Sequence, residues 1–274
     1  MQPMRKLLPL IVFCIFCMFS VFFVTFSSDQ YVTHQVDMIK NALSERNELS
    51  SLLNQMMKKS GQAECERRSR KIFSNNKGIS ESGGWCKKES SENSIEHKID
   101  QKLVKYLSNF LKGERVASFG DGPGMYKKYL DRTNMLELYD AYDGAPFAEN
   151  VTNGRVKFLD LSVPQYGLPV YDWVISLEVA EHIPAKYEKI FLSNLVRHAR
   201  TGIIMSWAVP GQDGYGHINN QPKSYVIQSM KKLGFDVNIE DSLELQSNCD
   251  LSWLQNNTMV YRRRDDELIN VQNA

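Results

Sequence analysis

Two carboxylates and an imidazole stand close together in the segment SLEVAEHIP, which continues the apolar run YDWVIS. The three residues are Glu178, Glu181 and His182. If a helix has begun at Glu178, the spacing of i, i+3 and i+4 places all three side chains on one face. Carboxylates and imidazoles bind divalent cations and also transfer protons in catalysis. The segment therefore predicts a metal or proton-transfer site at a strand end; the alternative is a helix start whose acids favour the helix dipole.

A histidine in a later loop is the candidate for a further ligand. The loop VPGQDGYGHINNQP contains three glycines that let it fold over the strand ends, and it carries His217. The predicted metal ligands, for Mg²⁺ or another divalent cation, are Glu178, Glu181, His182 and His217. The predicted catalytic residues are His217, Glu181 and His182. In a metal-free version His217 or His182 is the general base; a surface histidine without a role is the remaining reading of His217.

A glycine-rich turn and two acidic strand ends predict a second site. The segment FGDGPGM follows the strand RVASF and carries Gly120, Gly122 and Gly124. Glycines at a strand-to-helix turn let the backbone approach a ligand closely. Asp143 ends the next predicted strand, where a carboxylate of a doubly wound sheet accepts ribose hydroxyls, and Asp140 is the alternative if that strand ends early. Asp160 ends the strand after it, within reach of an adenine amine.

These residues need a sheet that brings strand ends together, and the second half of the chain predicts one. Strands alternate with helices from residue 99 onward, which is typical of a mostly parallel α/β sheet. The last two strands are expected to form an antiparallel pair at the sheet edge. The predicted strands are 115–120, 135–142, 156–161, 172–177, 202–208, 235–240 and 258–264, and the predicted helices are 99–112, 125–132, 185–199 and 223–234.

In this order, RVASFGDGPG, YDAYDG, KFLDL and YDWVISLEVAEHIP resemble the successive motifs of class I S-adenosylmethionine-dependent methyltransferases of the type 11 kind. The resemblance covers about Ile95 to Arg264. It implies a Rossmann-like seven-stranded sheet with S-adenosyl-L-methionine across the strand ends. The cofactor-binding residues that it implies are Gly120, Gly122, Gly124, Asp143, Asp160, Leu161 and Ser176.

The sequence departs from that family at one position. The family often has an acidic residue two positions before the first glycine, where this chain has Ser118, and Asp121 is the candidate substitute. A nicotinamide-binding unit is the alternative, but its G-x-G-x-x-G spacing is replaced here by G-x-G-x-G.

The segment around Glu181 and the later His217 also resemble metal-dependent O-methyltransferases. That resemblance implies O-methylation of a hydroxyl or diol acceptor, whose pKa the ion would lower. Two other classes of function stay open: a catalytically degenerate, membrane-tethered binding module with a methyltransferase fold, and a structural protein whose stalk oligomerises.

The N-terminus predicts a membrane anchor. Arg5 and Lys6 precede Leu7–Phe26, which has no charged residue and has the length that crosses a bilayer. The positive flank predicts a single-pass type II membrane protein with its domain in the Golgi or ER lumen. A cleaved signal peptide and a secreted protein are the alternative. The predicted domains are 1–28 (cytosolic tip and signal-anchor), 29–94 (stalk and linker), 95–264 (methyltransferase domain) and 265–274 (polar tail).

The stalk and the surface give weaker indications. A broken heptad pattern after residue 29 fits either a self-associating helix, hence a homo-oligomer, or an unpaired amphipathic helix. Cys65 and Cys86 either pair in an oxidising compartment or remain thiols. The net charge of +1 gives no field for nucleic acid, so the expected partner is a small-molecule or glycan acceptor. Sequons at Asn150 and Asn256 are compatible with a lumen.

Overall fold

The computed structural model describes residues 4–70, 78–86 and 98–264, with only the backbone described for residues 4–29. The chain groups into two compact units, Met1–Leu49 and Ser50–Ala274. The second unit includes the end of the first helix and a short hairpin, both of which fall in the predicted stalk and linker, 29–94. The predicted polar tail, 265–274, lies outside the described residues.

Helix α1 extends from Met4 to Arg70 and contains the predicted anchor, residues 7–26. Within the described part of the chain, no helix is both long and apolar enough to cross a membrane. The signal-anchor and the oligomeric stalk therefore stay predictions.

The second unit contains a seven-stranded sheet, as predicted. Its strand order is β3-β2-β1-β4-β5-β7-β6. All neighbours are parallel except β7, which runs antiparallel to both β5 and β6. The predicted antiparallel pair is thus present at one edge, with β6 outermost. The strands are β1 Arg115–Phe119, β2 Leu138–Asp143, β3 Lys157–Phe158, β4 Tyr171–Ser176, β5 Ala199–Ser206, β6 Phe235–Asn238 and β7 Thr258–Arg263.

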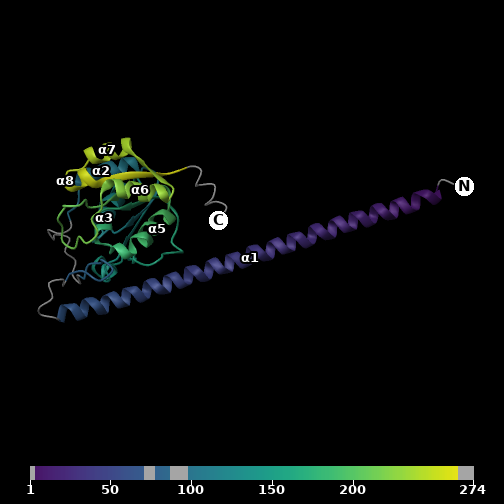
Figure 1. Ribbon diagram of the computed structural model, residues 1–274, viewed down its shortest axis with the longest axis horizontal. Helices are drawn as coiled ribbons and strands as arrows, with labels where there is room; N and C mark the ends of the chain where they lie inside the picture. Colours follow the sequence, from purple (N-terminus) through teal and green to yellow (C-terminus); the bar gives the residue numbers. More distant parts are fainter. Residues whose placement is uncertain (1–3, 71–77, 87–97, 265–274) are drawn as a thin grey trace. The chain divides into compact units, whose positions relative to one another are not determined.

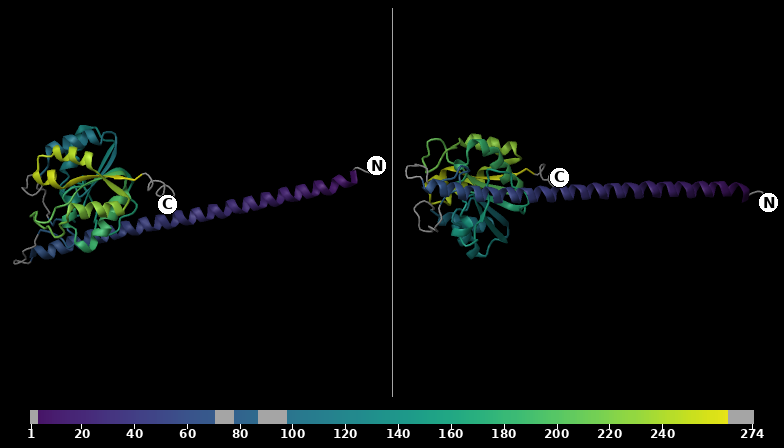
Figure 2. Two further views of the ribbon diagram at one scale, coloured as in Figure 1. Left: turned by 45° about the horizontal axis from the view of Figure 1, so that its top comes forward. Right: turned by 90° about the horizontal axis from the view of Figure 1, so that it is seen from below.

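Helices cover both faces of this sheet and enclose two apolar cores (Figures 1 and 2). One core packs α5 (Glu188–His198) and α6 (Lys223–Lys232) against the sheet. The other packs α2 (Gln101–Phe110), α3 (Met125–Thr133), α7 (Ile239–Ser247) and α8 (Ser252–Asn257) against it. The short elements are α4 Ala148–Val151 and the 3₁₀ turns η1 Ala180–His182 and η2 Ala185–Tyr187. Two-sided cover explains why β4 is buried along its whole length.

Two local features differ from the prediction. Strand β3 has only two residues; directly after it, the N–H of Leu159 donates to the carbonyl of Asp143, and the N–H of Asp160 donates to the side chain of Asn54 on α1. Helices α7 and α8 separate β6 from β7, where no helix was predicted. Helix α7 begins inside the expected strand 235–240, because the Asn238 side chain accepts a hydrogen bond from the N–H of Asp241 and caps it.

The end of α1 docks on the unit through polar side chains at a spacing of four residues, which places them on one helix face. Their partners are loop backbone groups beside β3, together with the carboxylate of Glu149. The four side chains are Ser50, Asn54, Lys58 and Gln62. A disulfide from Cys65 to Cys86 then attaches the segment Gly78–Cys86 to this helix.

Candidate active site

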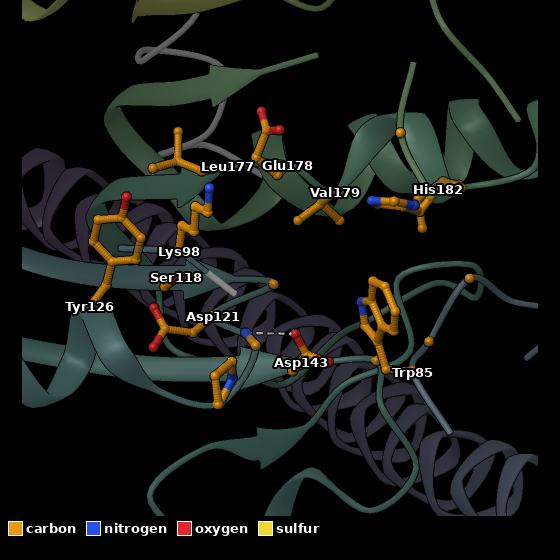
Figure 3. Close-up of a pocket in the computed structure, with 18 of the residues that line it drawn as sticks. Trp85, Lys98, Ser118, Asp121, Tyr126, Asp143, Leu177, Glu178, Val179 and His182 are labelled. Atoms are coloured by element: carbon orange, nitrogen blue, oxygen red, sulfur yellow. Dashed lines mark hydrogen bonds between the residues drawn. The ribbon is translucent and has the colours of Figure 1, made fainter. Parts of the chain in front are cut away.

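A cavity of about 670 Å³ opens at the carboxyl ends of β1, β2 and β4 (Figure 3). The chain leaves β1 towards β2 on one side and places β4 on the other, so the strand order reverses here. In open parallel sheets, such a crevice is where ligands bind. The cavity is lined by the glycine turn, by the ends of β2 and β4, by the loop around His217 and by the segment Ser82–Trp85.

The glycine turn follows β1 and depends on its lack of side chains. Gly120 has φ +102°, and a Cβ atom added there would lie 2.1 Å from Cγ2 of Val179. Gly122 has φ +56° and also lines the cavity. Gly124, with φ +77°, instead starts helix α3 and packs against Val156 outside the described lining. Two of the three predicted glycines therefore line the cavity, and the third shapes the turn.

Asp143, and not Asp140, is the acid of β2 that reaches the cavity. Its buried carboxylate accepts hydrogen bonds from the N–H groups of Gly122 at 2.8 Å and of Ala145 at 2.7 Å (Figure 3). These donors hold the carboxylate in one orientation. Asp140 turns away and accepts a hydrogen bond from the hydroxyl of Tyr171 at 2.9 Å.

The predicted residues after β3 also reach the cavity, whereas the predicted serine of β4 does not. Asp160 and Leu161 both line it. The Asp160 carboxylate accepts hydrogen bonds from the backbone N–H and the hydroxyl of Ser162, at 2.8 and 2.6 Å. Ser176 is fully buried, donates its hydroxyl to the carbonyl of Phe119 at 2.9 Å, and is not among the described lining residues. Its hydroxyl is thus bonded to the neighbouring strand β1.

Asp121 is the acidic group next to Ser118, as the sequence suggested. Burial raises the pKa of the Asp121 carboxyl to about 6, although hydrogen bonds from Ser118 and Tyr139 lower it in part. The Tyr139 hydroxyl donates at 2.9 Å. Both Ser118 and Asp121 line the cavity, with Lys98 and Tyr126 close by (Figure 3). Asp121 and Lys98 therefore add a carboxyl and an ammonium group to this end of the cavity.

At the other end, Glu181, His182 and His217 have ligand atoms close enough together to hold a metal ion. One ligand atom from each lies within 4.8 Å of the other two. Nε2 of His217 is 3.9 Å from Oε1 of Glu181, and the two imidazole rings are 5.2 Å apart. His182 and His217 line the same cavity as the glycine turn.

Backbone carbonyls orient both imidazoles. Nδ1 of His182 lies 3.1 Å from the carbonyl oxygen of Gly216, and Nδ1 of His217 lies 3.2 Å from that of Gln212. A carbonyl only accepts, so each Nδ1 carries the proton and the lone pair of each ring lies on Nε2. Gly214 makes room for this arrangement, since a Cβ atom there would lie 2.1 Å from Nε2 of His217.

Glu181 is the least satisfied polar group of the site. Its side chain is 0% exposed, and neither carboxylate oxygen has a hydrogen-bond partner in the described part of the chain. Burial, helped by the negative charge of Glu178, raises the pKa of the Glu181 carboxyl to about 8. The N–H groups of Glu181 and Ala208 lower this pKa somewhat without forming hydrogen bonds to the carboxylate. A buried carboxylate of this kind is stabilised by a cation.

Glu178 is not part of that cluster, although it was predicted as a ligand. Its carboxylate accepts a hydrogen bond from the Ser206 hydroxyl at 2.8 Å, and its N–H donates to the same hydroxyl oxygen at 2.7 Å. Burial raises its pKa. The predicted common helix face is wrong, because Glu178 has φ +58° and the turn η1 begins only at Ala180.

Of the aromatic residues near the site, Trp207 packs in the core, whereas Tyr215 and Trp85 line the cavity. Trp207 is in the core, where its Nε1 donates to the carbonyl of Asn219 at 2.6 Å. Tyr215 is 54% exposed and lines the cavity. Its partner is Trp85, which stacks on it with ring centroids 5.6 Å apart. Trp85 lies in the segment predicted as linker, and no periodicity pointed to it.

No family model matches the sequence, and no curated protein matches it. Solved structures do match. The structure is similar to magnesium protoporphyrin IX methyltransferase from Synechocystis with bound SAM, at 17% identity over 77% of this chain and 97% of that chain, with TM-score 0.46. It is similar to the sugar N-methyltransferase KedS8 from Streptoalloteichus, at 12% identity over 60% and 88% of the chains, with TM-score 0.47. It is also similar to a TehB-like SAM-dependent methyltransferase from Corynebacterium glutamicum, at 14% identity over 63% and 90%, with TM-score 0.44. At such low similarity, the ligand of this chain has to be inferred from its own cavity.

Proposed function

We propose that this protein is a methyltransferase that uses S-adenosyl-L-methionine to methylate an oxygen of a hydroxyl or diol acceptor. One observation carries the proposal. A single cavity joins the glycine turn and Asp143 at one end to His182 and His217 at the other. A nucleoside cofactor and a hydroxyl acceptor would therefore meet in one cavity.

The residues at the first end fit the cofactor. The oriented Asp143 carboxylate would accept the ribose hydroxyls, and the bare backbone at Gly120 and Gly122 would lie against the ligand. Asp121 and Lys98 supply opposite charges for the amino and carboxylate groups of the methionine part. The bound cofactor supplies an electrophilic methyl group on a sulfonium.

The residues at the second end fit a divalent ion. The buried, unpartnered Glu181 and the two oriented imidazoles give one oxygen and two nitrogen donors. Such a mixed set suits Mn²⁺, Fe²⁺ or Zn²⁺ better than Mg²⁺, which prefers oxygen ligands. The ion would lower the pKa of an acceptor hydroxyl. Without an ion, an imidazole Nε2 or the Glu181 carboxylate would take up that proton.

The location proposed for the enzyme is the lumen of the secretory pathway, with a glycan or another polyol as acceptor. The N-terminal apolar run supports a type II anchor. Asn150 and Asn256, the two sequon asparagines, are both exposed. An endoglycosidase shift of the wild type that disappears in the Asn150→Gln, Asn256→Gln double variant would support a lumenal domain. An unglycosylated protein in secretory membranes would contradict it.

The activity is tested first by calorimetric titration of S-adenosylhomocysteine into the full chain purified in mild detergent, with EDTA or with Mn²⁺. We expect micromolar binding that Asp143→Ala weakens and Glu181→Gln leaves intact. We expect Mn²⁺ alone to bind the wild type and not the Glu181→Gln variant. Cofactor binding without Mn²⁺ binding would favour metal-free base catalysis. A folded protein that binds neither would favour the degenerate binding module.

A further inference from the structure

The segment Gly78–Cys86 is a small hairpin that lies outside the predicted methyltransferase domain. Its ends pair through the N–H of Cys86 and the carbonyl of Gly78, at 2.8 Å, and through a bridge between Ile79 and Trp85. Its tip is closed by Ser80, whose backbone and side chain both bond to Gly84. The hairpin is therefore an ordered element with its own hydrogen bonds.

Four consecutive residues of this hairpin line the cavity, namely Ser82, Gly83, Gly84 and Trp85. A Cβ atom added at Gly84 would lie 2.1 Å from the carbonyl oxygen of Gly144, the residue after Asp143. A Cβ atom at Gly83 would lie 2.5 Å from the carbonyl oxygen of His182. The hairpin thus contacts the backbone of Gly144, next to Asp143, and the backbone of His182 at the same time.

Trp85 extends this contact to the acceptor end. Its ring stacks on Tyr215 and meets the His182 ring edge-on, with centroids 6.2 Å apart. In the close-up, Trp85 lies between the labelled Asp143 and His182 (Figure 3). The hairpin therefore spans from the cofactor end of the cavity to the acceptor end.

Among the described residues, one covalent bond besides the chain itself fastens the hairpin to the body of the unit. That bond is the disulfide from Cys86 to Cys65 on α1. Helix α1 is held in turn by the polar stripe beginning at Ser50. A noncovalent contact supports the same attachment, since Arg68 donates to the carbonyl of Ile79 at 3.1 Å.

We propose that the hairpin Gly78–Cys86 is a wall of the ligand-binding cavity, and that the Cys65–Cys86 disulfide positions it. This rests on the proposed function for the identity of the ligand, but not for the wall itself. When the tether is cut, the hairpin is in place for only a fraction of the time. The observed dissociation constant rises by the inverse of that fraction.

The experiment compares the oxidised full chain with three variants. Cys86→Ser removes the tether, whereas Gly84→Ala keeps it and wedges the hairpin away from Gly144. The matched control is Glu81→Ala in the same hairpin; its side chain is 82% exposed, and its described ion pair, to Arg68 at 3.7 Å, uses a different nitrogen from the bond that Arg68 donates to Ile79. Hydrogen exchange is measured on peptides that contain Gly144 and His182, and S-adenosylhomocysteine is titrated into each protein.

Cys86→Ser and Gly84→Ala are both expected to raise exchange at the two covered peptides and to raise the dissociation constant by about tenfold or more. The control should match the wild type within about twofold. Unchanged exchange in both variants would overturn the wall, even if the wild type binds no S-adenosylhomocysteine. Raised exchange with unchanged affinity would overturn the role in ligand binding. If the wild type does not bind S-adenosylhomocysteine but exchange is raised in both variants, the hairpin is still a wall of the cavity and only the proposed function is refuted.

Discussion

Replacing Glu181 by glutamine tests the candidate metal site, because the variant should change both the pH dependence of stability and the binding of Mn²⁺. The side chain is buried and its carboxylate has no hydrogen-bond partner among the described residues. Its pKa is raised from 4.5 to about 8. A raised pKa in a folded carboxyl means that the folded state holds the proton longer than the unfolded chain does. The protonated carboxyl contributes its full amount to the free energy of unfolding below pH 4.5. This contribution is lost as the pH rises to about 8.

The size of the effect follows from that shift. The free energy of unfolding is lowered by about 1 kcal/mol at pH 5 and by about 3 kcal/mol at pH 7, relative to a carboxyl with an unshifted pKa. Glutamine cannot ionise, so Glu181→Gln should remove a decline of about 2 kcal/mol between these two pH values. The pH dependence is the better measure, because a glutamine amide at this position also lacks partners and costs stability at every pH.

The assay is denaturant unfolding of the full chain at pH 5 and pH 7 in EDTA. The control is Asp100→Asn, because the Asp100 carboxylate is equally buried but accepts hydrogen bonds from the N–H groups of Leu103, Asp250 and Leu251. That variant should lose about 1–3 kcal/mol. Saturating Mn²⁺ should then stabilise the wild type by about 3 kcal/mol at a hundredfold excess over its dissociation constant, and should not stabilise Glu181→Gln. Equal pH dependence in the wild type and Glu181→Gln would refute the inference of a desolvated carboxylate.

Three further substitutions test the two ends of the cavity. Gly120→Ala should lower the free energy of unfolding by about 2–5 kcal/mol, because the new Cβ would clash with Val179 and the φ of Gly120 is positive. The control is Gly113→Ala, whose Cβ would have no described atom within 4 Å and which should cost about 1 kcal/mol in the same denaturation assay. Gly214→Ala should displace His217 and lower Mn²⁺ affinity at least about tenfold in calorimetry, with S-adenosylhomocysteine affinity unchanged; loss of both affinities would indicate general unfolding. Asp143→Asn should weaken S-adenosylhomocysteine binding by about tenfold to a hundredfold, since its amide would face N–H donors; unchanged binding would remove Asp143 from the cofactor site.

The sheet and the cofactor end of the cavity were predictable because they depend on local patterns. The glycine turn and Asp143 stand at fixed distances along one strand-turn-helix-strand unit, and parallel strands bring their carboxyl ends to one edge. The choice between Asp143 and Asp140 depends on the residue at which β2 ends, and only the structure shows that residue. Glu181 and His182 were identified by residue type next to a buried strand. His217 was identified only as a loop histidine, and the structure brings it within 3.9 Å of Glu181.

The remaining features depend on backbone geometry and on contacts between distant parts of the chain. Ser176 was misplaced because β4 is buried on both faces. Its sequence therefore has no alternation of polar and apolar residues that would show which way each side chain points. Glu178 was misassigned because its φ is positive, and nothing in the sequence indicates a positive φ at a glutamate. The hairpin wall was missed because Ser, Gly and charged residues have the composition of a linker. What orders it is a disulfide and the glycine contacts of its tip, and composition shows neither.

The disulfide also has a consequence for biosynthesis. Its two cysteines are 21 residues apart, and both precede β1, which begins at Arg115. A growing chain emerges from the ribosome N-terminus first. Cys65 and Cys86 can therefore be joined while the sheet has yet to be translated, and closing so short a loop costs little entropy. The polar stripe of α1 binds residues about a hundred positions later, such as Phe158. One wall of the cavity is thus prepared ahead of the strands whose ends it will cover.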